Sequence, residues 1–275
     1  MTTRKLNFLL TNDDGIRAPG LWVAARALSA LGSVVIVAPS ENCSGYGTAL
    51  PPMKSLSYLP YHHGDEHPPR VTAFGLDGTP ATCAYVGLSG VFGHTPIDLV
   101  VSGVNLGANM GRDVFYSGTV GAALTAQLHG TPSIAVSLDA DEATAACWDA
   151  AGWAVRKVVE MWPYGQESAA LLFNVNVPNR PATALAGIRL TSLGVDSFLN
   201  RYQFEVSAVD PYVITATHLG ATHLGAAPTG EPEMGTDAWA VEQGYVSITP
   251  IQPLPELMRV VPWYNVATQA LLSRP

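Results

Sequence analysis

The chain has 275 residues, of which 48% are hydrophobic and 13% are charged, so it does not have the composition of a disordered protein and we expect one large globular domain. Its net charge of −8 argues against long nucleic acid as the main partner, because duplexes are held by clustered cations, although one local site can still bind a small anion. No stretch approaches the roughly 18 uninterrupted apolar residues that a membrane-spanning helix needs.

Strand-like and helix-like segments alternate along the first two thirds of the sequence. Short apolar runs predict strands at 6–10, 34–37, 98–103, 133–136 and 170–177. Helical patterns lie between them at 19–32, 119–129 and 142–162, the first of which has Pro19 near its start. Three or more strand-helix-strand units predict a doubly wound, mostly parallel α/β sheet.

After about residue 185 the sequence changes to short β-like runs separated by Gly- and Pro-rich segments, for example at 188–191, 212–217 and 245–248. We therefore expect residues 1–275 to form a single α/β domain in which about 185–250 is a β-rich extension. A five-residue segment at 216–220 is repeated at 221–225, which is too short for a structural repeat and predicts a loop.

The cysteines and the N-terminus predict a cytoplasmic protein. Cys43, Cys83 and Cys147 are an odd number of widely spaced thiols without a C-x-x-C pair, which favours a reducing compartment. The N-terminus lacks the apolar region of a signal peptide. Two further residues, His62 and His63, lie in a segment rich in Gly, Pro and Asp, which predicts a solvated loop rather than a metal site.

Two adjacent carboxylates, Asp13 and Asp14, directly follow the first predicted strand. Their mutual repulsion is costly unless a cation or hydrogen-bond donors neutralise them. A hard divalent metal with oxygen ligands is the simplest solution. The alternative, in which one Asp caps the next helix and the other faces solvent, remains open at this point.

Three other loops follow predicted strands or open a helix, and parallel strands gather such loops at one edge of the sheet. One loop contains Ser44, a glycine-rich loop contains Asn105 and Asn109, and a helix begins near Ser117 and Thr119. A glycine-rich loop and a helix N-terminus both present backbone N–H groups to an anion. Together with the carboxylates, these loops predict a metal ion beside a phosphate cradle, an arrangement suited to hydrolysis of a phosphate ester. The dinucleotide, P-loop and G-x-S-x-G motifs are all absent from the sequence.

Several spaced motifs resemble the SurE family of nucleotidases: LLTNDDG (9–15), APG (18–20), VAP (37–39), SG (44–45), SGVN (102–105) with Gly107 and Asn109, YSGTV (116–120), NVNVP (174–178) and GYVSITP (244–250). The resemblance implies a Rossmann-like core and a divalent-metal-dependent phosphatase that hydrolyses nucleoside 5′- and 3′-monophosphates. It implies one Mg²⁺ or Mn²⁺ per subunit, with the ligands Asp13, Asp14, Ser44 and Asn105. Of these, Asp13, Asp14 and Asn105 would be catalytic, and Asp13 would orient or activate the attacking water. The phosphate contacts it implies are Asn109, Ser117, Gly118 and Thr119.

The resemblance also implies a homodimer or homotetramer formed through the C-terminal extension, in some members by exchange of a β-hairpin. The sequence departs from the family at Thr82, where an acidic residue is common, and across 197–231. These departures keep open an alternative, a SurE-type phosphatase specialised for a phosphorylated biosynthetic intermediate. A second alternative is a nucleotide-binding protein without turnover.

Overall fold

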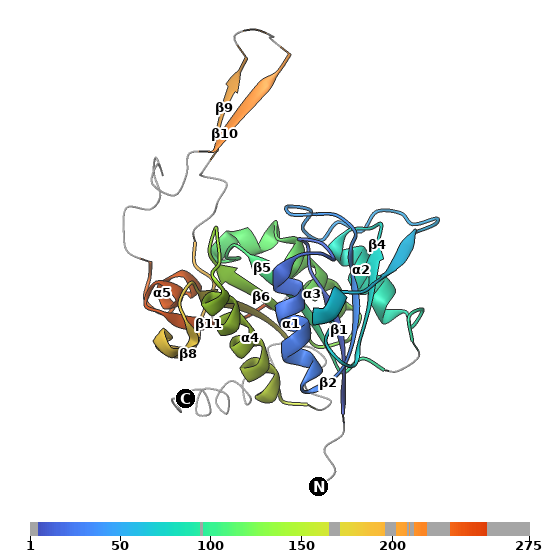
Figure 1. Cartoon of the computed structure of the whole chain (residues 1–275). Helices are drawn as coiled ribbons and strands as arrows, with labels where there is room; N and C mark the ends of the chain where they lie inside the picture. Colours follow the sequence, from blue (N-terminus) through green and yellow to red (C-terminus); the bar gives the residue numbers. More distant parts are fainter. Residues whose placement is uncertain are drawn as a thin grey trace.

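The computed structural model describes residues 5–93, 96–164, 171–195, 202–207, 209, 212–218 and 232–251. Nine strands form one sheet: β1 (Leu6–Thr11), β2 (Gly32–Pro39), β3 (Tyr58–Tyr61), β4 (Val71–Leu76), β5 (Leu99–Leu106), β6 (Ser133–Asp139), β7 (Leu172–Pro178), β8 (Gly187–Leu190) and β11 (Tyr245–Pro250). Their order across the sheet is β3-β4-β2-β1-β5-β6-β7-β11-β8. Around the sheet lie α1 (Pro19–Ser29), α2 (Pro80–Leu88), α3 (Gly118–Leu128), α4 (Ala145–Glu160) and α5 (Asp237–Glu242) (Figure 1).

The central strands of this sheet are parallel, which confirms the predicted doubly wound α/β fold. In the middle of the sheet, Leu9 of β1 pairs with Val35 of β2 and with Val100 of β5. Among the described strands of the sheet, antiparallel pairing joins only β3 to β4 and β11 to β7. Because β8 and β11 join the main sheet, part of the predicted β-rich extension widens the core instead of forming a separate layer.

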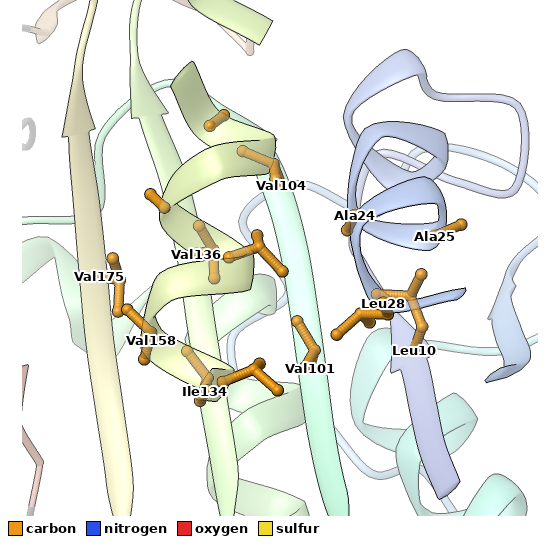
Figure 2. Packing of buried hydrophobic residues seen from close by; sticks show 14 of the residues in the cluster. Leu10, Ala24, Ala25, Leu28, Val101, Val104, Ile134, Val136, Val158 and Val175 are labelled. Atoms are coloured by element: carbon orange, nitrogen blue, oxygen red, sulfur yellow. The ribbon is translucent and has the colours of Figure 1, made fainter. Parts of the chain in front are cut away.

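Helices cover both faces of the sheet, and alternate side chains of β1 show the two layers. Phe8 and Leu10 belong to the hydrophobic cluster that includes α1 and α4, whereas Leu9 packs with Cys83 of α2 and Ala126 of α3. Figure 2 shows the first cluster, with Leu10 lying near Leu28 of α1. This alternation is the period of two that a strand buried on both faces requires.

Most of these helices begin at a residue whose side chain accepts a backbone N–H. Ser117 accepts from Val120 at the start of α3, and Thr79 accepts from Thr82 at the start of α2. Thr144 and Thr236 cap α4 and α5 in the same way. Such caps satisfy N–H groups that have no partner inside the helix, and they fix where each helix starts.

A second, two-stranded antiparallel sheet consists of β9 (Tyr202–Val206) and β10 (Ile214–His218). It projects away from the main sheet in Figure 1. The sequence repeat at 216–225 is expected to form a loop, but residues 216–218 pair with β9 as part of β10 and the rest of the repeat lies outside the described residues. Among the described residues, no helix combines the length and apolarity that crossing a bilayer requires.

Candidate functional site

Three of the predicted site residues lie at the carboxyl ends of β1 and β5, which are neighbours in the sheet. The loop after β1 carries Asp13 and Asp14, and Asn105 lies near the end of β5. The N-terminus of α3, with Ser117 as its cap, faces the same edge because Gly118 and Thr119 contact Asp13. The structure therefore brings Asp13 and the start of α3 into contact, two parts that the sequence predicted to share one edge of the sheet.

Asp13 is the more buried of the two carboxylates, with 3% of its surface exposed. The Thr119 hydroxyl donates a hydrogen bond to its Oδ1, and the amides of Gly118 and Thr119 also favour its charged form. Burial nevertheless dominates and raises the pKa of Asp13 above its ordinary value. The N–H groups and the positive end of α3 thus face a carboxylate that is costly to bury as an anion.

Glycine is required at position 118 because α3 starts against Asp13. A Cβ built on Gly118 would lie 2.8 Å from Cβ and 2.9 Å from Oδ2 of Asp13. Real Cβ atoms do not approach other atoms this closely, so a side chain here would displace either the carboxylate or the helix. The absence of a side chain lets the first turn of α3 approach the carboxylate.

Asp14 is held by groups from the end of β5 and from the loop after β2. Its Oδ2 accepts a hydrogen bond from the amide of Leu106 (3.3 Å), and its Oδ1 accepts one from Nδ2 of Asn42 (3.4 Å). Burial, and next the charge of Asp13, raise the pKa of Asp14 to about 6. Two adjacent acids with raised pKa values form a site where a cation would be stabilising.

Asn42 links Asp14 to Ser44, a role that the sequence analysis did not find. Its Oδ1 accepts a hydrogen bond from the Ser44 amide at 2.9 Å, while its Nδ2 reaches Asp14. Ser44 itself is exposed, in the loop after β2. The only local signal was an Asn two residues before a Ser, an arrangement typical of Asx turns.

Asn105 has its amide group fixed in one orientation. Its Nδ2 donates to the Gly107 carbonyl at 2.7 Å, so Oδ1 is the atom left to accept from a donor or to bind a cation. Two carboxylates, an amide oxygen and a serine hydroxyl are oxygen donors of the kind that Mg²⁺ and Mn²⁺ take. Among the described residues no group of three or more His, Cys, Asp and Glu side chains is placed to hold a metal. A metal at this edge would therefore depend on Ser and Asn oxygens as well as on the Asp pair.

Asn109 is buried, and its amide, its carbonyl and its side-chain Nδ2 already have partners. Its Nδ2 donates to the Ser137 hydroxyl at 2.8 Å, and its amide donates to Oδ1 of Asn176 at 2.8 Å. Its carbonyl accepts from Nδ2 of both Asn174 and Asn176. These bonds anchor the glycine-rich loop to β6 and β7, and a phosphate contact through Nδ2 would require Asn109 to leave Ser137. A direct contact between Asn109 and phosphate stays a prediction.

Asp237 anchors the other end of the same loop, and the sequence analysis missed it. This buried residue accepts hydrogen bonds from the amide of Gly111 on Oδ2 and from the amide of Gly194 on Oδ1, both at 2.8 Å. Burial raises its pKa above the ordinary value, although three neighbouring amides and its own favour the anion. The sequence offers only a Thr-Asp pair before a short helix, which would indicate a helix cap and nothing more.

The segment around His63 is less solvated than the sequence predicts, because two of its three histidines are partly buried. His62 is exposed, but the ring of His63 stacks on Trp22 at 4.2 Å between centroids. Nδ1 of His67 accepts from the His63 amide, and its Nε2 lies 2.9 Å from the Val71 carbonyl. Both ring nitrogens of His67 therefore have protein partners, and this cluster packs against α1.

Comparison with known proteins identifies the family. The family model described as "Survival protein SurE" matches residues 8–200. The chain is 37% identical over 250 residues to the 5′-nucleotidase SurE of Nitrosococcus oceani, which covers 90% of this chain and 91% of that protein. The chain belongs to the SurE family.

The SurE fold is also found by comparison with solved structures. The crystal structure of the SurE protein from Aquifex aeolicus is 31% identical in sequence and aligns with a TM-score of 0.70. The alignment covers 94% of this chain and 99% of that one. The similarity therefore extends beyond the sheet that carries the site.

The departure from the SurE pattern at Thr82 affects packing. Thr82 is buried in the first turn of α2, where its hydroxyl lies 2.9 Å from that of Thr79 and its amide donates to the Thr79 hydroxyl. The Thr79 hydroxyl in turn donates to the Ala49 carbonyl at 2.6 Å. Thr82 thus supports the cap of α2, and this cap holds the end of the Ser44 loop.

Proposed function

We propose that this SurE-family hydrolase of phosphoric monoesters is a divalent-metal-dependent phosphatase that converts nucleoside 5′- and 3′-monophosphates to nucleoside and phosphate. The observation that carries the proposal is the contact between Thr119 and Asp13, which joins a helix N-terminus to an acidic pair. A helix N-terminus favours phosphate, and an acidic pair with further oxygen donors favours a cation. Side by side, a cation and a phosphate cradle supply the two kinds of charge stabilisation that suit hydrolysis of a phosphoester.

In this proposal Asp13, Asp14, Ser44 and Asn105 hold one Mg²⁺ or Mn²⁺ per subunit. When bound, such an ion polarises a phosphoryl oxygen and lowers the pKa of water. The orientation of the Asn105 amide supports its role, because Nδ2 is occupied by Gly107 and Oδ1 is left as a ligand atom. The raised pKa values of Asp13 and Asp14 also support a cation between them.

The chain's own groups would bind and orient the substrate. The hydroxyl of Ser117 would donate to a phosphate oxygen at the positive end of α3, and the amides of Gly118 and Thr119 would contact phosphate when they are released from Asp13. Asp13, held by the Thr119 hydroxyl, would accept a hydrogen bond from the attacking water and so align it. Asn109 would keep the glycine-rich loop in place and contact the phosphate only if its amide is released from Ser137.

We also propose that the protein forms a homodimer or homotetramer through β9 and β10. The support is the exposure of apolar side chains on this ribbon: Phe204 is 66% exposed, Val206 64% and Ile214 68%. Isolated two-stranded hairpins are marginally stable in water, so a ribbon of this kind gains from burial against a second copy. Light scattering of the full chain tests the state, and a monomer that keeps full activity would contradict it.

A phosphate-release screen tests the proposed activity. The full chain is stripped of metal with a chelator, Mg²⁺ or Mn²⁺ is added back, and release is measured from 5′- and 3′-nucleoside monophosphates, sugar phosphates and p-nitrophenyl phosphate. Metal-dependent release that favours nucleoside monophosphates is the expected result. Release from the generic ester alone would replace the nucleotide by another phosphorylated metabolite, and no release from any ester would overturn the proposal.

A further inference from the structure

A cavity of about 660 Å³ lies between α1 and α4, and none of the residues proposed above for metal or phosphate lines it. Six of its lining residues are of two kinds, three tryptophans and three arginines: Trp22, Trp148, Trp153, Arg17, Arg26 and Arg156. We call this cavity the α1–α4 groove. Its volume is in the range of sites that take small ligands, which span about 300–1,000 Å³.

A glycine of α4, Gly152, faces Val23 of α1 in the lining of the groove. A Cβ built on Gly152 would lie 3.3 Å from Cγ1 of Val23, so the absence of a side chain lets α4 approach α1 closely at this point. Trp148 and Trp153 come from the same helix on either side of Gly152, and both are only partly buried. Two indole rings of α4 therefore line the groove next to the place where the two helices lie close together.

The aromatic lining includes a preformed stack. Trp22 is 1% exposed, and its Nε1 donates to the Ile16 carbonyl at 2.8 Å, so its ring is fixed. His63 lies parallel to it, with ring centroids 4.2 Å apart and an interplanar angle of 6°. Trp22 is thus covered, and the surface that this stack offers to another flat ring is the partly exposed ring of His63, which the contact with Trp22 holds in place.

The charge of the groove favours an anion. Three of the chain's 14 lysines and arginines line it, against two carboxylates, Glu66 and Asp149, in a chain of net charge −8. The ion pairs of two of these arginines are long and solvated: Arg17 to Glu41 is 3.6 Å and Arg26 to Glu66 is 3.9 Å. Such pairs contribute little stability, so these guanidinium groups can turn toward a ligand. Arg156, by contrast, is held at 2.6 Å by Glu160.

We propose that the α1–α4 groove binds a small planar aromatic anion. The ring would lie against Trp148 and Trp153, and the anionic group would meet Arg17 or Arg26. Guanidinium groups pair with carboxylate, sulfonate or phosphate oxygens and also stack on aromatic rings. The arginines of the groove would therefore bind the anionic group of the ligand, and the tryptophans would bind its ring. Nucleotides and aromatic carboxylates share this chemistry.

Isothermal titration calorimetry of the full chain with naphthalene-2-sulfonate tests the proposal. We expect saturable binding of one molecule per subunit. Arg26→Gln and Arg17→Gln should each raise Kd about threefold to tenfold, as loss of a solvent-exposed charged hydrogen bond does. Trp153→Leu should weaken binding at least as much, with the thermal midpoint measured to show that the variant is folded. Lys54→Gln, which removes an exposed cation outside the groove, should leave Kd unchanged.

Two further experiments show whether the charge of the ligand is recognised and which class of natural ligand the groove takes. The neutral naphthalene-2-sulfonamide should bind more weakly than the sulfonate, because it lacks the charge that the arginines recognise. Displacement of the sulfonate by adenosine 5′-monophosphate in the Asp13→Asn background would assign the groove to nucleotides, and displacement by indole-3-acetate would assign it to aromatic carboxylates. The proposal fails if no saturable binding occurs, if the sulfonamide binds equally well, if the arginine variants behave like Lys54→Gln, or if neither anion competes.

Discussion

The hydroxyl of Thr119 donates a hydrogen bond to Oδ1 of Asp13, and this contact joins two residues that are 106 positions apart in the sequence. It connects the first turn of α3 with the loop after β1. Since Asp13 is a proposed metal ligand and Thr119 a proposed phosphate contact, the two halves of the site form one hydrogen-bonded unit. A substitution of either residue should therefore change the position of the other.

Thr119→Val should lower kcat/KM by about tenfold to a hundredfold, the range seen when a partner that orients a metal ligand is removed. The valine keeps the shape of threonine but cannot donate to Asp13, so the carboxylate loses the group that orients it. Steady-state kinetics with the best substrate of the phosphate-release screen measures the effect. Thr125→Val is the matched control, because its hydroxyl lies in the same helix and donates only to the Gly121 carbonyl. Equal activity of the two variants would contradict the positioning role of Thr119.

Asp13→Asn and Asp14→Asn should each lower metal-dependent phosphatase activity by more than about a hundredfold, because loss of a ligand exceeds loss of a group that only orients one. The fold should be retained, since the change is nearly isosteric and removes the repulsion between two neighbouring acids. Kinetics and thermal unfolding of the metal-free proteins measure the two effects. Asp141→Asn, an exposed carboxylate outside the site, serves as control. Retention of activity in both site variants would remove the basis for the metal assignment.

Gly118→Ala should lower both activity and stability. The added methyl would lie 2.8 Å from Cβ of Asp13, so the start of α3 or the carboxylate must move. Overpacking of this kind costs about 1–3 kcal/mol of unfolding free energy. Urea unfolding and kinetics check the prediction, with Gly152→Ala as the control for activity, because that glycine lies in a helix interior away from the site. A Gly118→Ala variant with native activity would show that α3 does not need to approach Asp13 so closely.

The sequence predicted the elements that carry a strong local pattern and missed those that do not. The strand-helix alternation gave β1, α1 and β2 with ends that differ from the structure by only a few residues. β4 and α2 were not predicted. α2 has only nine residues and is buried on most of its surface, so it lacks the polar face from which a helical period is recognised.

In the candidate site too, the sequence predicted the residues that a local pattern marks and missed those that only long-range contacts bring in. Asp13, Asp14 and Asn105 were predicted because they follow apolar runs, and parallel strands place such residues at one edge. Asn42 and Asp237 were not, since their roles depend on contacts with Asp14 and Gly111 that are 28 and 126 residues away in the sequence. The pairing of β11 with β7 likewise joins distant segments, and only the folded chain shows that it widens the main sheet.

Asp237→Asn should destabilise the protein by about 1–3 kcal/mol, the cost of leaving a buried donor without its acceptor. Both oxygens of Asp237 accept backbone amides, from Gly111 and Gly194, and an asparagine would place an NH₂ group against one of them. Urea unfolding measures the loss, and activity should fall as well because Gly111 belongs to the loop of Asn109. Glu242→Gln, an exposed acid at the end of the same helix, should change neither quantity. Unchanged stability of Asp237→Asn would mean that the loop is held by other contacts.

His63 should make the stability of the protein fall in mildly acidic solution. The pKa of His63 lies below its ordinary value of 6.5, chiefly because the ring is buried against Trp22. Neighbouring charged or titratable groups have smaller effects: Glu66 raises this pKa, and Arg26, His67 and His62 lower it. The folded chain therefore binds a proton on His63 less readily than the unfolded chain does. Above the unfolded-state pKa of 6.5 the ring is neutral in both states, so its contribution to the unfolding free energy is fully present there. It decreases as the pH falls from 6.5 toward the lowered folded-state pKa.

The His63→Phe variant keeps a flat ring on Trp22 and removes the titrating group, so it should lose less stability than the parent between about pH 7.5 and pH 5.5. Urea unfolding at a series of pH values measures this difference. His129→Gln removes an exposed histidine at the end of α3 and should follow the parent profile. The prediction is contradicted if His63→Phe and the parent lose stability in parallel over this pH interval. His63 would then have the same pKa in the folded and the unfolded chain, and the stack on Trp22 would not oppose protonation of the ring.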